Sequence, residues 1–417
     1  MTAHARPADE RPDRAELHET TCCVVGAGPG GAVLALLLAR KGVPVVLLEA
    51  HEDFERDFRG DTIHPSVMEL LDDLGLAERL LQLRHTKIHS FAFNTGFGPV
   101  TVGDFRRLKT KFPYITMLPQ SDFLRFVTDE AKRFPNFELR MEARVQELIE
   151  EDGRVRGVRY EGEDGLHEVR AALTVGADGR GSRVRHLSRL GEDVLKTSPP
   201  MDVLWFRVPR FASDPAGAVG RIGRGHIVVM LDRADQWQCG YLMLKGTFGE
   251  VRAAGLDALK ASIGDIAPDL KDRLGHLTSW KQFSMLSVES SRLKTWHRPG
   301  LLLIGDAAHV MSPVGGVGIN YAIQDAVAAA NVLSAPLLAG DVRDAHLREV
   351  QRQREWPTRV VQAVQRTVQS RVIAGVLDSD QPIRLPLLLR LLLRTPILRD
   401  LPARFIAYGV RRTRVES

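Results

Sequence analysis

A glycine-rich turn near the start of the chain constrains the fold more than any other feature. It follows the apolar run 21–25, opens the helical stretch 32–41, and consists of Gly26, Ala27, Gly28, Pro29, Gly30 and Gly31. Gly26 permits a tight turn, Gly28 lets the backbone approach a pyrophosphate, and Gly31 lets the helix pack closely on the strand. The helix N-terminus faces the phosphate charge. This unit predicts an open α/β sheet with a nucleotide site at the turn.

Glu49 completes the unit, because it ends a second apolar strand over 44–48. At that position a carboxylate accepts hydrogen bonds from the hydroxyls of an adenosine ribose. Glycines also cap helices after strands, so the glycine pattern alone is weak evidence. The strand before the turn, the helix after it and the acid at the next strand end together favour nucleotide binding.

A later segment has the features of a ligand site at the end of a strand. The apolar strand predicted over 301–304 is broken by Gly305, so Asp306 emerges where open α/β sheets bind ligands. A helix is predicted over 319–333, and its N-terminus points back at this place. The glycines before it allow close backbone approach, and they are Gly315, Gly316 and Gly318. The alternative is that Asp306 only caps the next helix.

These two segments, with a middle one at Gly176, Ala177, Asp178 and Gly179, resemble in this order the flavoprotein monooxygenases of the para-hydroxybenzoate hydroxylase type. The resemblance spans about residues 20–375 and implies non-covalently bound FAD. It also implies NAD(P)H as co-substrate, because the family's middle motif touches both cofactors. By resemblance, Asp306 would bind the ribityl chain, and the turn 313–320 would pass beside the isoalloxazine ring.

The cofactor contacts expected from the residues and from this resemblance include two positions outside the three segments, Arg59 and Gln120. The complete set is Gly26, Gly28, Pro29, Gly30, Gly31, Glu49, Arg59, Gln120, Asp178, Gly179, Gly305, Asp306, Pro313, Gly315, Gly316, Gly318, Ile319 and Asn320. No metal site is expected.

The predicted fold class is α/β, with a Rossmann-type FAD-binding domain interleaved with a mostly antiparallel β-sheet substrate domain and followed by a helical C-terminus. We assign residues 19–90, 120–198 and 291–375 to the FAD-binding domain. Residues 91–119 and 199–290 form the substrate domain, because β-like segments punctuated by Gly and Asp dominate there. Residues 1–18 are charged and lack an apolar segment, which predicts a disordered tail.

Composition fits this class and excludes others. The 417 residues are 44% hydrophobic, enough for a large core, and the formal net charge of +5 is compatible with attracting a phosphorylated cofactor. No zinc finger or RNA-binding strand motif occurs, so nucleic acid is not an expected partner. Cys22, Cys23 and Cys239 have neither disulfide nor metal spacing, which favours a reducing cytoplasm. No apolar run is long enough to span a bilayer.

The segment 376–417 is basic, Leu-rich and predicted to be helical, with arginines at 384, 390, 394, 399, 404, 411, 412 and 414. Such a helix can lie on an anionic membrane surface, or it can cover its own domain or a partner subunit in a homodimer. Packing on protein is favoured, because Pro386, Pro396 and Pro402 cut the segment into short pieces.

The expected activity is that of an NAD(P)H-dependent FAD monooxygenase, which uses O2 to hydroxylate or epoxidise a small aromatic or polyketide-like molecule through a flavin hydroperoxide. No catalytic triad is expected, and the catalytic residues stay unknown. Tyr241, His226 and Lys245 lie on the predicted substrate sheet and are weak candidates for a base. Trp205, Phe206 and Trp237 are candidate pocket walls.

Three alternatives stay open at this point. Related FAD folds also reduce double bonds in isoprenoid-like lipids, and O2-dependent product formation separates that reductase activity from a monooxygenase. A flavin halogenase is disfavoured, because no Trp-x-Trp-x-Ile-Pro segment occurs. A non-enzymatic nucleotide-fold carrier would have no reason to keep all three segments.

Overall fold

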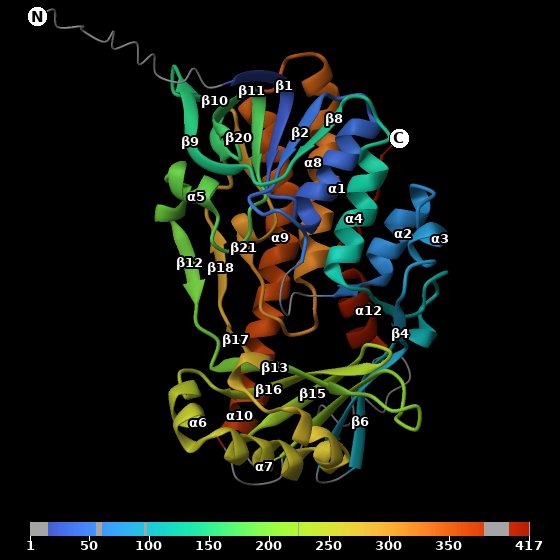
Figure 1. The fold of residues 1–417 in the computed structure, drawn as a ribbon. Coiled ribbons are helices and arrows are strands. Elements are labelled where there is room, and N and C mark those ends of the chain that lie inside the picture. Colours follow the sequence, from blue (N-terminus) through green and yellow to red (C-terminus); the bar gives the residue numbers. More distant parts are fainter. Residues whose placement is uncertain (1–15, 56–60, 96–97, 224, 379–399, 417) are drawn as a thin grey trace, which may run out of the picture.

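The computed structural model describes residues 16–55, 61–95, 98–223, 225–378 and 400–416. It consists of a helix-covered parallel sheet at one end and a mostly antiparallel sheet at the other, joined by long helices (Figure 1). The predicted mixed α/β class with a helical C-terminal region is confirmed.

The first sheet, sheet A, has a parallel centre in which neighbouring strands are far apart in sequence. Antiparallel strands extend it at both β11 and β20. Its main path runs β19 (His297–Arg298), β20 (Leu301–Leu303), β11 (Gly165–Gly176), β1 (Glu16–Val25), β2 (Val45–Leu48) and β8 (Phe137–Arg140), with β10 (Arg154–Gly162) and β9 (Arg144–Glu151) paired beside β11. The central strands are continuous apolar runs because both faces of the sheet are covered.

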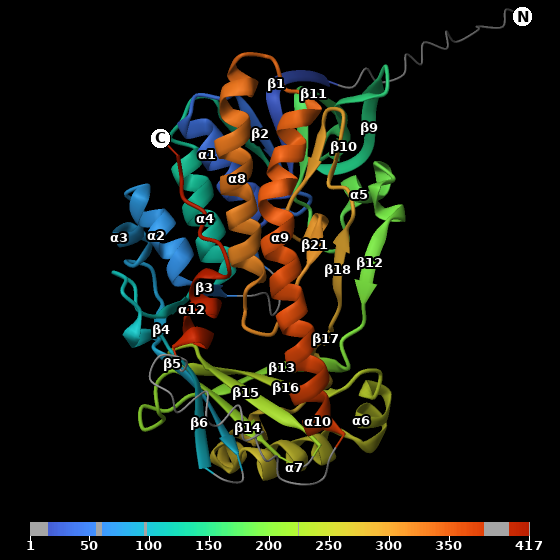
Figure 2. The ribbon, with the colours of Figure 1, turned by 180° about the vertical axis from the view of Figure 1, so that it is seen from behind.

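Helices cover one face of sheet A and extend towards the second sheet (Figure 2). They are α1 (Pro29–Arg40), α4 (Gln120–Ala131), α8 (Gly318–Leu338) and α9 (Asp344–Val368), and the shorter α2 (Pro65–Asp73) and α3 (Ala77–Leu80) lie beside α4. α9 continues through the π-helical turn Gln369–Ile373 into α10 (Ala374–Leu377), which packs on the second sheet.

The second sheet, sheet C, has two distinct faces. Its order is β17 (Ser284–Ser287), β13 (Met201–Pro209), β16 (Gln236–Leu244), β15 (Ile227–Asp232), β14 (Ala218–Ile222), β5 (Ser90–Thr95) and β6 (Gly98–Asp104), and only the β14–β5 pairing is parallel. The outer face packs on α7 (Leu256–Ile266) and on the 3-10 segment Pro268–His276, with α6 (Phe248–Ala254) at its edge. The inner face is turned towards α10 and the loop that precedes α8.

Two smaller sheets connect the larger ones. One joins β3 (Thr62–Ile63), β7 (Ile115–Met117) and β4 (Thr86–Ile88), and the other joins β12 (Val194–Thr197), β18 (Ser290–Leu293) and β21 (His309–Val310). Both lie between sheet A and sheet C, so the chain passes repeatedly between the two ends of the molecule (Figure 1).

The two terminal predictions are partly outside the described residues. β1 begins at Glu16, inside the predicted tail 1–18, and this boundary is corrected because Leu17 and His18 pair with Glu168 and Val169 of β11. Residues 1–15 and 379–399, which include four of the eight arginines of the basic segment, lie outside the description.

The described part of the C-terminal segment packs on its own chain. Ala403, Ala407 and Tyr408 of α12 (Leu401–Tyr408) are buried beside β4 and β7, and the Tyr408 hydroxyl donates to Glu69 at 2.9 Å. Among the described helices, none is both long and apolar enough to cross a membrane.

Candidate cofactor and substrate site

The ends of four parallel strands bring the three sequence motifs to one level. Val25 pairs with Leu48 and Gly176, and Gly176 pairs with Leu303, so the four strands end side by side. Each is followed by a motif residue, and these are Gly26, Glu49, Ala177 and Ile304. Segments almost 280 residues apart in the chain therefore line one edge of sheet A, the edge where open α/β sheets bind ligands.

The first turn fits a phosphate-bearing cofactor. A Cβ added at Gly26 would lie 2.6 Å from Asp178 Cα, and a Cβ added at Gly31 would lie 1.9 Å from the Gly26 carbonyl oxygen. Packing alone therefore requires both glycines. At Gly28 the nearest protein atom would be 3.9 Å away, so the space beside this residue is open. Pro29 is the first residue of α1, and no side chain caps the N-terminus of this helix. The free N–H groups of a helix N-terminus suit a pyrophosphate.

Glu49 lies at the rim of this turn with its carboxylate oriented by the backbone. One oxygen accepts a hydrogen bond from Ala27 N at 2.9 Å, and the other accepts from His51 N at 3.2 Å. The carboxylate is therefore held at the strand end, as recognition of a ribose requires.

The middle motif supports the turn mainly through its own loop. Asp178 accepts hydrogen bonds from the Ser182 hydroxyl at 2.5 Å and from Val184 N at 3.0 Å, which fixes the start of α5 (Arg183–Leu187). Burial raises the pKa of Asp178, and these bonds oppose that effect. Gly179 adopts a positive φ of 82° with no neighbour within 4 Å of an added Cβ.

Asp306 follows β20 at the same edge and is partly exposed, with a side-chain accessibility of 29%. Its carboxylate pairs with Arg180 of the middle motif at 3.3 Å. The neighbouring Arg185 donates to the carbonyl oxygens of Asp306 and Ala307. The middle and late motifs are thus joined directly, and Asp306 remains accessible to a ligand hydroxyl.

A buried ionic cluster behind the late motif is absent from the sequence predictions. Asp325 of α8 accepts hydrogen bonds from Gly305 N at 3.0 Å, from His309 Nε2 at 2.6 Å and from Arg354 Nε at 2.7 Å. Burial alone would raise the pKa of Asp325, but His309 and Arg354 hold it below its usual value. The ionised carboxylate fixes the Gly305 turn. A single acidic residue in the largely apolar α8 is the sequence signal that could have indicated a buried ion pair, although it does not identify the distant partners.

The glycine-rich turn 313–318 is held from one side by Asn320. Its amide oxygen accepts from His64 N at 2.8 Å, and its amide nitrogen donates to the carbonyl oxygens of Thr62 and Gly316. An added Cβ at Gly316 would lie 2.9 Å from Thr62 Oγ1. Asn320 therefore acts here as a clamp between β3 and the turn. Pro313, Gly315, Gly318 and Ile319 lie in the turn or in the first residues of α8.

Glutamines along α9 and the π-helical turn after it bind the segment 310–314, which leads into the same turn. Gln362 donates to Val310 O and Ser291 O, and Gln365 donates to Ser312 O and Val314 O, all at 2.8–3.1 Å. Gln369 donates to the Ser312 hydroxyl. Sequence reasoning missed these glutamines, because polar residues at helical spacing normally mark a solvated face.

The two isolated FAD positions have different outcomes. Gln120 is the first residue of α4, and its backbone N–H donates to Asp61 at 3.0 Å, next to β3. Arg59 lies outside the described residues.

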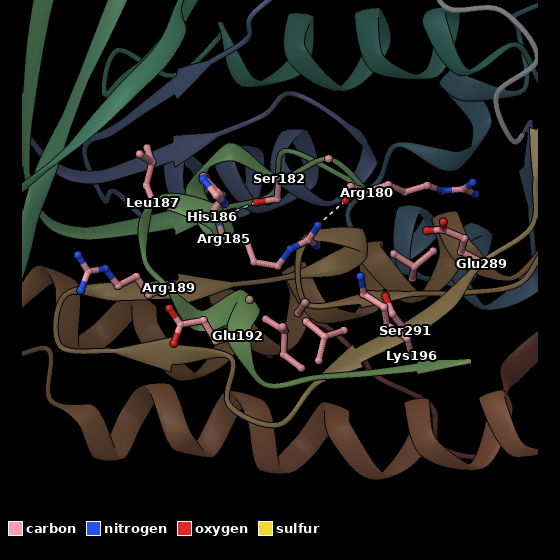
Figure 3. A pocket seen from close by; sticks show the side chains of 16 residues that line it. Arg180, Ser182, Arg185, His186, Leu187, Arg189, Glu192, Lys196, Glu289 and Ser291 are labelled. Carbon is pink, nitrogen blue, oxygen red and sulfur yellow. Dashed lines mark hydrogen bonds between the residues drawn. The ribbon is translucent and has the colours of Figure 1, made fainter. Parts of the chain in front are cut away.

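A basic pocket of about 770 Å³ opens beside the middle motif, between α5 and the strands β12, β18 and β21. Figure 3 shows its side chains, and Arg185 reaches from α5 towards the backbone of Arg180. The basic lining residues are Arg180, Arg185, His186, Arg189 and Lys196, and the acidic ones are Glu192 and Glu289. This excess of cationic groups suits a phosphorylated ligand.

The three candidate bases lie away from the strand ends. Tyr241 is on the outer face of sheet C, where its hydroxyl contacts Ser262 of α7 at 3.0 Å and its ring stacks on His226. Lys245 clamps the end of sheet C by donating to Asp202, Ser287 and Val288. These positions argue against each of the three side chains as a base that acts on a substrate near the turn 313–318.

The candidate pocket walls divide between the two faces. Phe206 and Trp237 are in the outer core, whereas Trp205 is on the inner face beside Val203 and Leu242. Among the described residues, no cluster of three metal-ligating side chains occurs. The three cysteines are buried, and burial raises the pKa of each thiol.

Comparison with known proteins agrees with this geometry. The family model described as FAD binding domain matches residues 19–367. The chain is 35% identical to 6-methylpretetramide 4-monooxygenase of Streptomyces rimosus, covering 100% of this chain and 97% of the relative. It is 28% identical to para-nitrophenol 4-monooxygenase of a Pseudomonas strain, over 76% of this chain and 78% of that protein.

Among solved structures, the anhydrotetracycline hydroxylase OxyS from Streptomyces rimosus superposes with a TM-score of 0.71 and 26% identity, covering 93% of this chain and 76% of that one. The family match covers most of the chain and includes all three motifs at the edge of sheet A. The chain therefore belongs to the FAD-binding domain family of flavoprotein monooxygenases.

Proposed function

We propose that this protein is an NAD(P)H-dependent FAD monooxygenase that hydroxylates an aromatic, polyketide-like molecule. The observation that carries the proposal is the meeting of three FAD motifs at one sheet edge, opposite a second sheet with a partly exposed apolar inner face. The full-length similarity to a monooxygenase named for a polyketide substrate supports this substrate class.

When FAD is bound, it supplies the redox chemistry with O2 that side chains cannot provide. One atom of O2 enters a C–H bond of the substrate, the other leaves as water, and NAD(P)H supplies the two electrons. We infer that Gly28 and the α1 N-terminus hold the pyrophosphate, Glu49 the adenosine ribose, and Asp306 the ribityl chain. The remaining task of the chain is to position the substrate and to exclude water.

We also infer that the basic pocket beside α5 binds the phosphates of NAD(P)H. It adjoins the middle motif, the charged residues of its lining are more often cationic than acidic, and Arg180 links it to Asp306. The substitution Arg189→Glu is expected to raise the KM for NAD(P)H at least tenfold, whereas the Kd for FAD should stay unchanged. A cytoplasmic location belongs to the same proposal, because this compartment supplies NAD(P)H and keeps the three thiols reduced.

The decisive experiment measures whether an oxygen atom from O2 enters the product. Purified protein is loaded with FAD and mixed with NAD(P)H, ¹⁸O-labelled O2 and a panel of phenols, quinones and aromatic polyketides that includes 6-methylpretetramide. Substrate-stimulated NAD(P)H oxidation and a product with one labelled oxygen are the expected result. A stoichiometric reduced product without any need for O2 would instead make the protein a reductase.

A further inference from the structure

One row of residues across the inner face of sheet C forms a flat apolar surface, which we call the aromatic floor. Strand register aligns Trp205 with Gly240, Gly240 with Val229, Val229 with Gly220, and Gly220 with Phe93. The row crosses five strands, which is four strand spacings or about 19 Å.

Two glycines make this surface flat. An added Cβ at Gly220 would lie 2.2 Å from the Phe93 ring, and one at Gly240 would lie 3.1 Å from the Trp205 ring. Each aromatic ring therefore lies across the neighbouring strand and does not stand upright from the sheet. Val229 fills the place between the two rings and is only partly buried, as both rings are.

Helical segments cover the sheet on both sides of this row. On one side, Ile373 and Val376 pack on the row that contains Val203 and Leu242. On the other side, Ala403 and Tyr408 of α12 pack near Ala218. The aromatic floor is the strip left between these two covers.

The turn 313–318 connects to both covers. Val314 packs in the α10 cluster, and an added Cβ at Gly315 would lie 4.0 Å from Ile406 of α12. The turn assigned to the flavin ring therefore borders the same strip. This places the strip where a substrate of the proposed monooxygenase would lie.

A cation lies at one end of the floor. Arg207 follows Trp205 by two residues in β13, so it lies on the same face, and it is exposed. Gln238, its register partner, is 4% exposed, and its side-chain oxygen has no hydrogen-bond partner among the described residues. A guanidinium and an amide oxygen together suit an edge that carries phenolic oxygens.

We propose that the aromatic floor selects flat substrates of several fused aromatic rings, with Trp205 and Phe93 as the specificity-determining side chains and Arg207 holding an ionised phenolic oxygen. This inference rests on the proposed function and narrows its substrate class. A single ring would cover only a fraction of a floor of this length, and stacking on two flat rings favours an extended planar molecule.

Equilibrium binding to the FAD-loaded protein tests the inference without turnover. The probes are phenol, naphthol, a hydroxyanthraquinone, a hydroxynaphthacenequinone and a saturated four-ring hydroxysteroid, each titrated by calorimetry. Affinity is expected to rise with the number of flat rings, and the flat four-ring probe should bind at least tenfold more tightly than the steroid. Equal affinity for phenol and the flat four-ring probe, or for that probe and the steroid, would overturn the proposal.

Variants assign the effect to named side chains. Trp205→Leu and Phe93→Leu keep an apolar side chain but remove the flat ring, and each should weaken the four-ring probe about tenfold and phenol less than twofold. Val219→Ala is the matched control, because Val219 precedes Gly220 on the same strand and faces the other side. An equal loss of affinity in Val219→Ala, or an equal loss for all probes in the ring variants, would show that Trp205 and Phe93 do not determine the specificity.

Arg207→Gln tests the polar end. It should abolish the preference for the phenolate over the neutral phenol, seen as a pH-independent Kd across the ionisation of the hydroxyanthraquinone. A pH dependence identical to that of the unsubstituted protein would remove Arg207 from the proposal. A protein that incorporates labelled oxygen but shows no dependence on ring number contradicts only this inference, whereas ring-dependent binding without oxygenation contradicts the proposed function.

Discussion

Single polar residues, buried and fully engaged, position the parts of the site that the glycine motifs form. Asp325 gathers Gly305, His309 and Arg354 around one carboxylate, and Asn320 bridges β3 and the turn 313–318. Neither residue needs to touch the cofactor to matter. Their hydrogen bonds fix the backbone that a ligand would meet.

Asp306 offers a direct test at this scale, because its carboxylate is partly exposed and pairs with Arg180, which is partly exposed as well. Asp306→Ala should weaken FAD binding by about 1.5 to 3 kcal/mol, the range of a hydrogen bond to a charged group. Titration calorimetry of the apoprotein measures the loss, and urea unfolding of the same variant controls for folding. Unchanged FAD affinity in a folded variant would assign Asp306 a purely structural role.

His64 predicts a pH dependence of stability. Burial lowers the pKa of His64 from its usual 6.5 to about 4, although the hydrogen bond to the Ile406 carbonyl oxygen opposes that shift. Between these values the unfolded chain binds the proton and the folded chain does not. The folded state therefore loses about 3 kcal/mol as the pH falls from about 6.5 to about 4.

Urea unfolding of the apoprotein at several pH values measures this slope. In His64→Phe the part of the slope that belongs to this residue should disappear, whereas in the exposed control His276→Ala it should persist. A slope that is unchanged in His64→Phe would show that other groups cause it.

At the scale of elements, glycines that look alike in sequence have separable roles. Gly28 ends the turn between β1 and α1, and Gly31 lies in the first turn of α1, but only the space beside Gly28 is free of protein. Gly31→Ala is expected to prevent α1 from packing and to yield little folded protein. Gly28→Ala should fold with nearly unchanged stability and lose at least tenfold in FAD affinity, because its methyl group occupies the space for the pyrophosphate.

Thermal unfolding with and without FAD separates the two variants. The expected result for Gly28→Ala is an unchanged Tm of the apoprotein and a reduced rise on adding FAD. Tight FAD binding by Gly28→Ala would contradict the placement of the pyrophosphate.

The strand-end motifs were readable from sequence because turns that require glycine leave a local pattern. The inner and outer faces of sheet C were not readable. Helices cover the outer face and α10 and α12 cover parts of the inner one, so both faces of β16 are apolar and no alternation marks Tyr241 as facing outward. The glutamines of α9 were missed for the related reason that their partners are backbone carbonyls distant in sequence.

At the scale of the whole molecule, an ion pair joins the two ends. Arg233, between β15 and β16, forms a buried ion pair with Asp61, which precedes β3. Burial raises the pKa of Asp61, and the charges of Arg233 and Arg207 oppose that shift. The pair therefore ties sheet C to the segment that borders the turn 313–318.

Arg233→Ala should lower the free energy of unfolding by about 3 to 5 kcal/mol, because Asp61 is left buried without its partner. The double variant Asp61→Asn, Arg233→Ala should be more stable than Arg233→Ala alone, since no uncompensated charge remains. Urea unfolding of the unsubstituted protein, the two single variants Asp61→Asn and Arg233→Ala, and the double variant gives the comparison. A double variant with the summed loss of both single changes would show that the pair has no coupling.

The α9 amides also determine how freely this enzyme can diverge. Gln362 and Gln365 bind the carbonyl oxygens of Val310, Ser312 and Val314, and these atoms are present whatever side chains occupy the three positions. At Val314, which is only partly buried, the path of the loop is thus fixed without help from the side chain. Val310 and Ser312 are buried, and the Ser312 hydroxyl is itself a hydrogen-bond partner, so these two positions should tolerate little change. Random substitution at Val314 should yield a high fraction of folded proteins with an altered surface beside the turn 313–318, which makes this position a favourable starting point for changing the substrate by directed evolution.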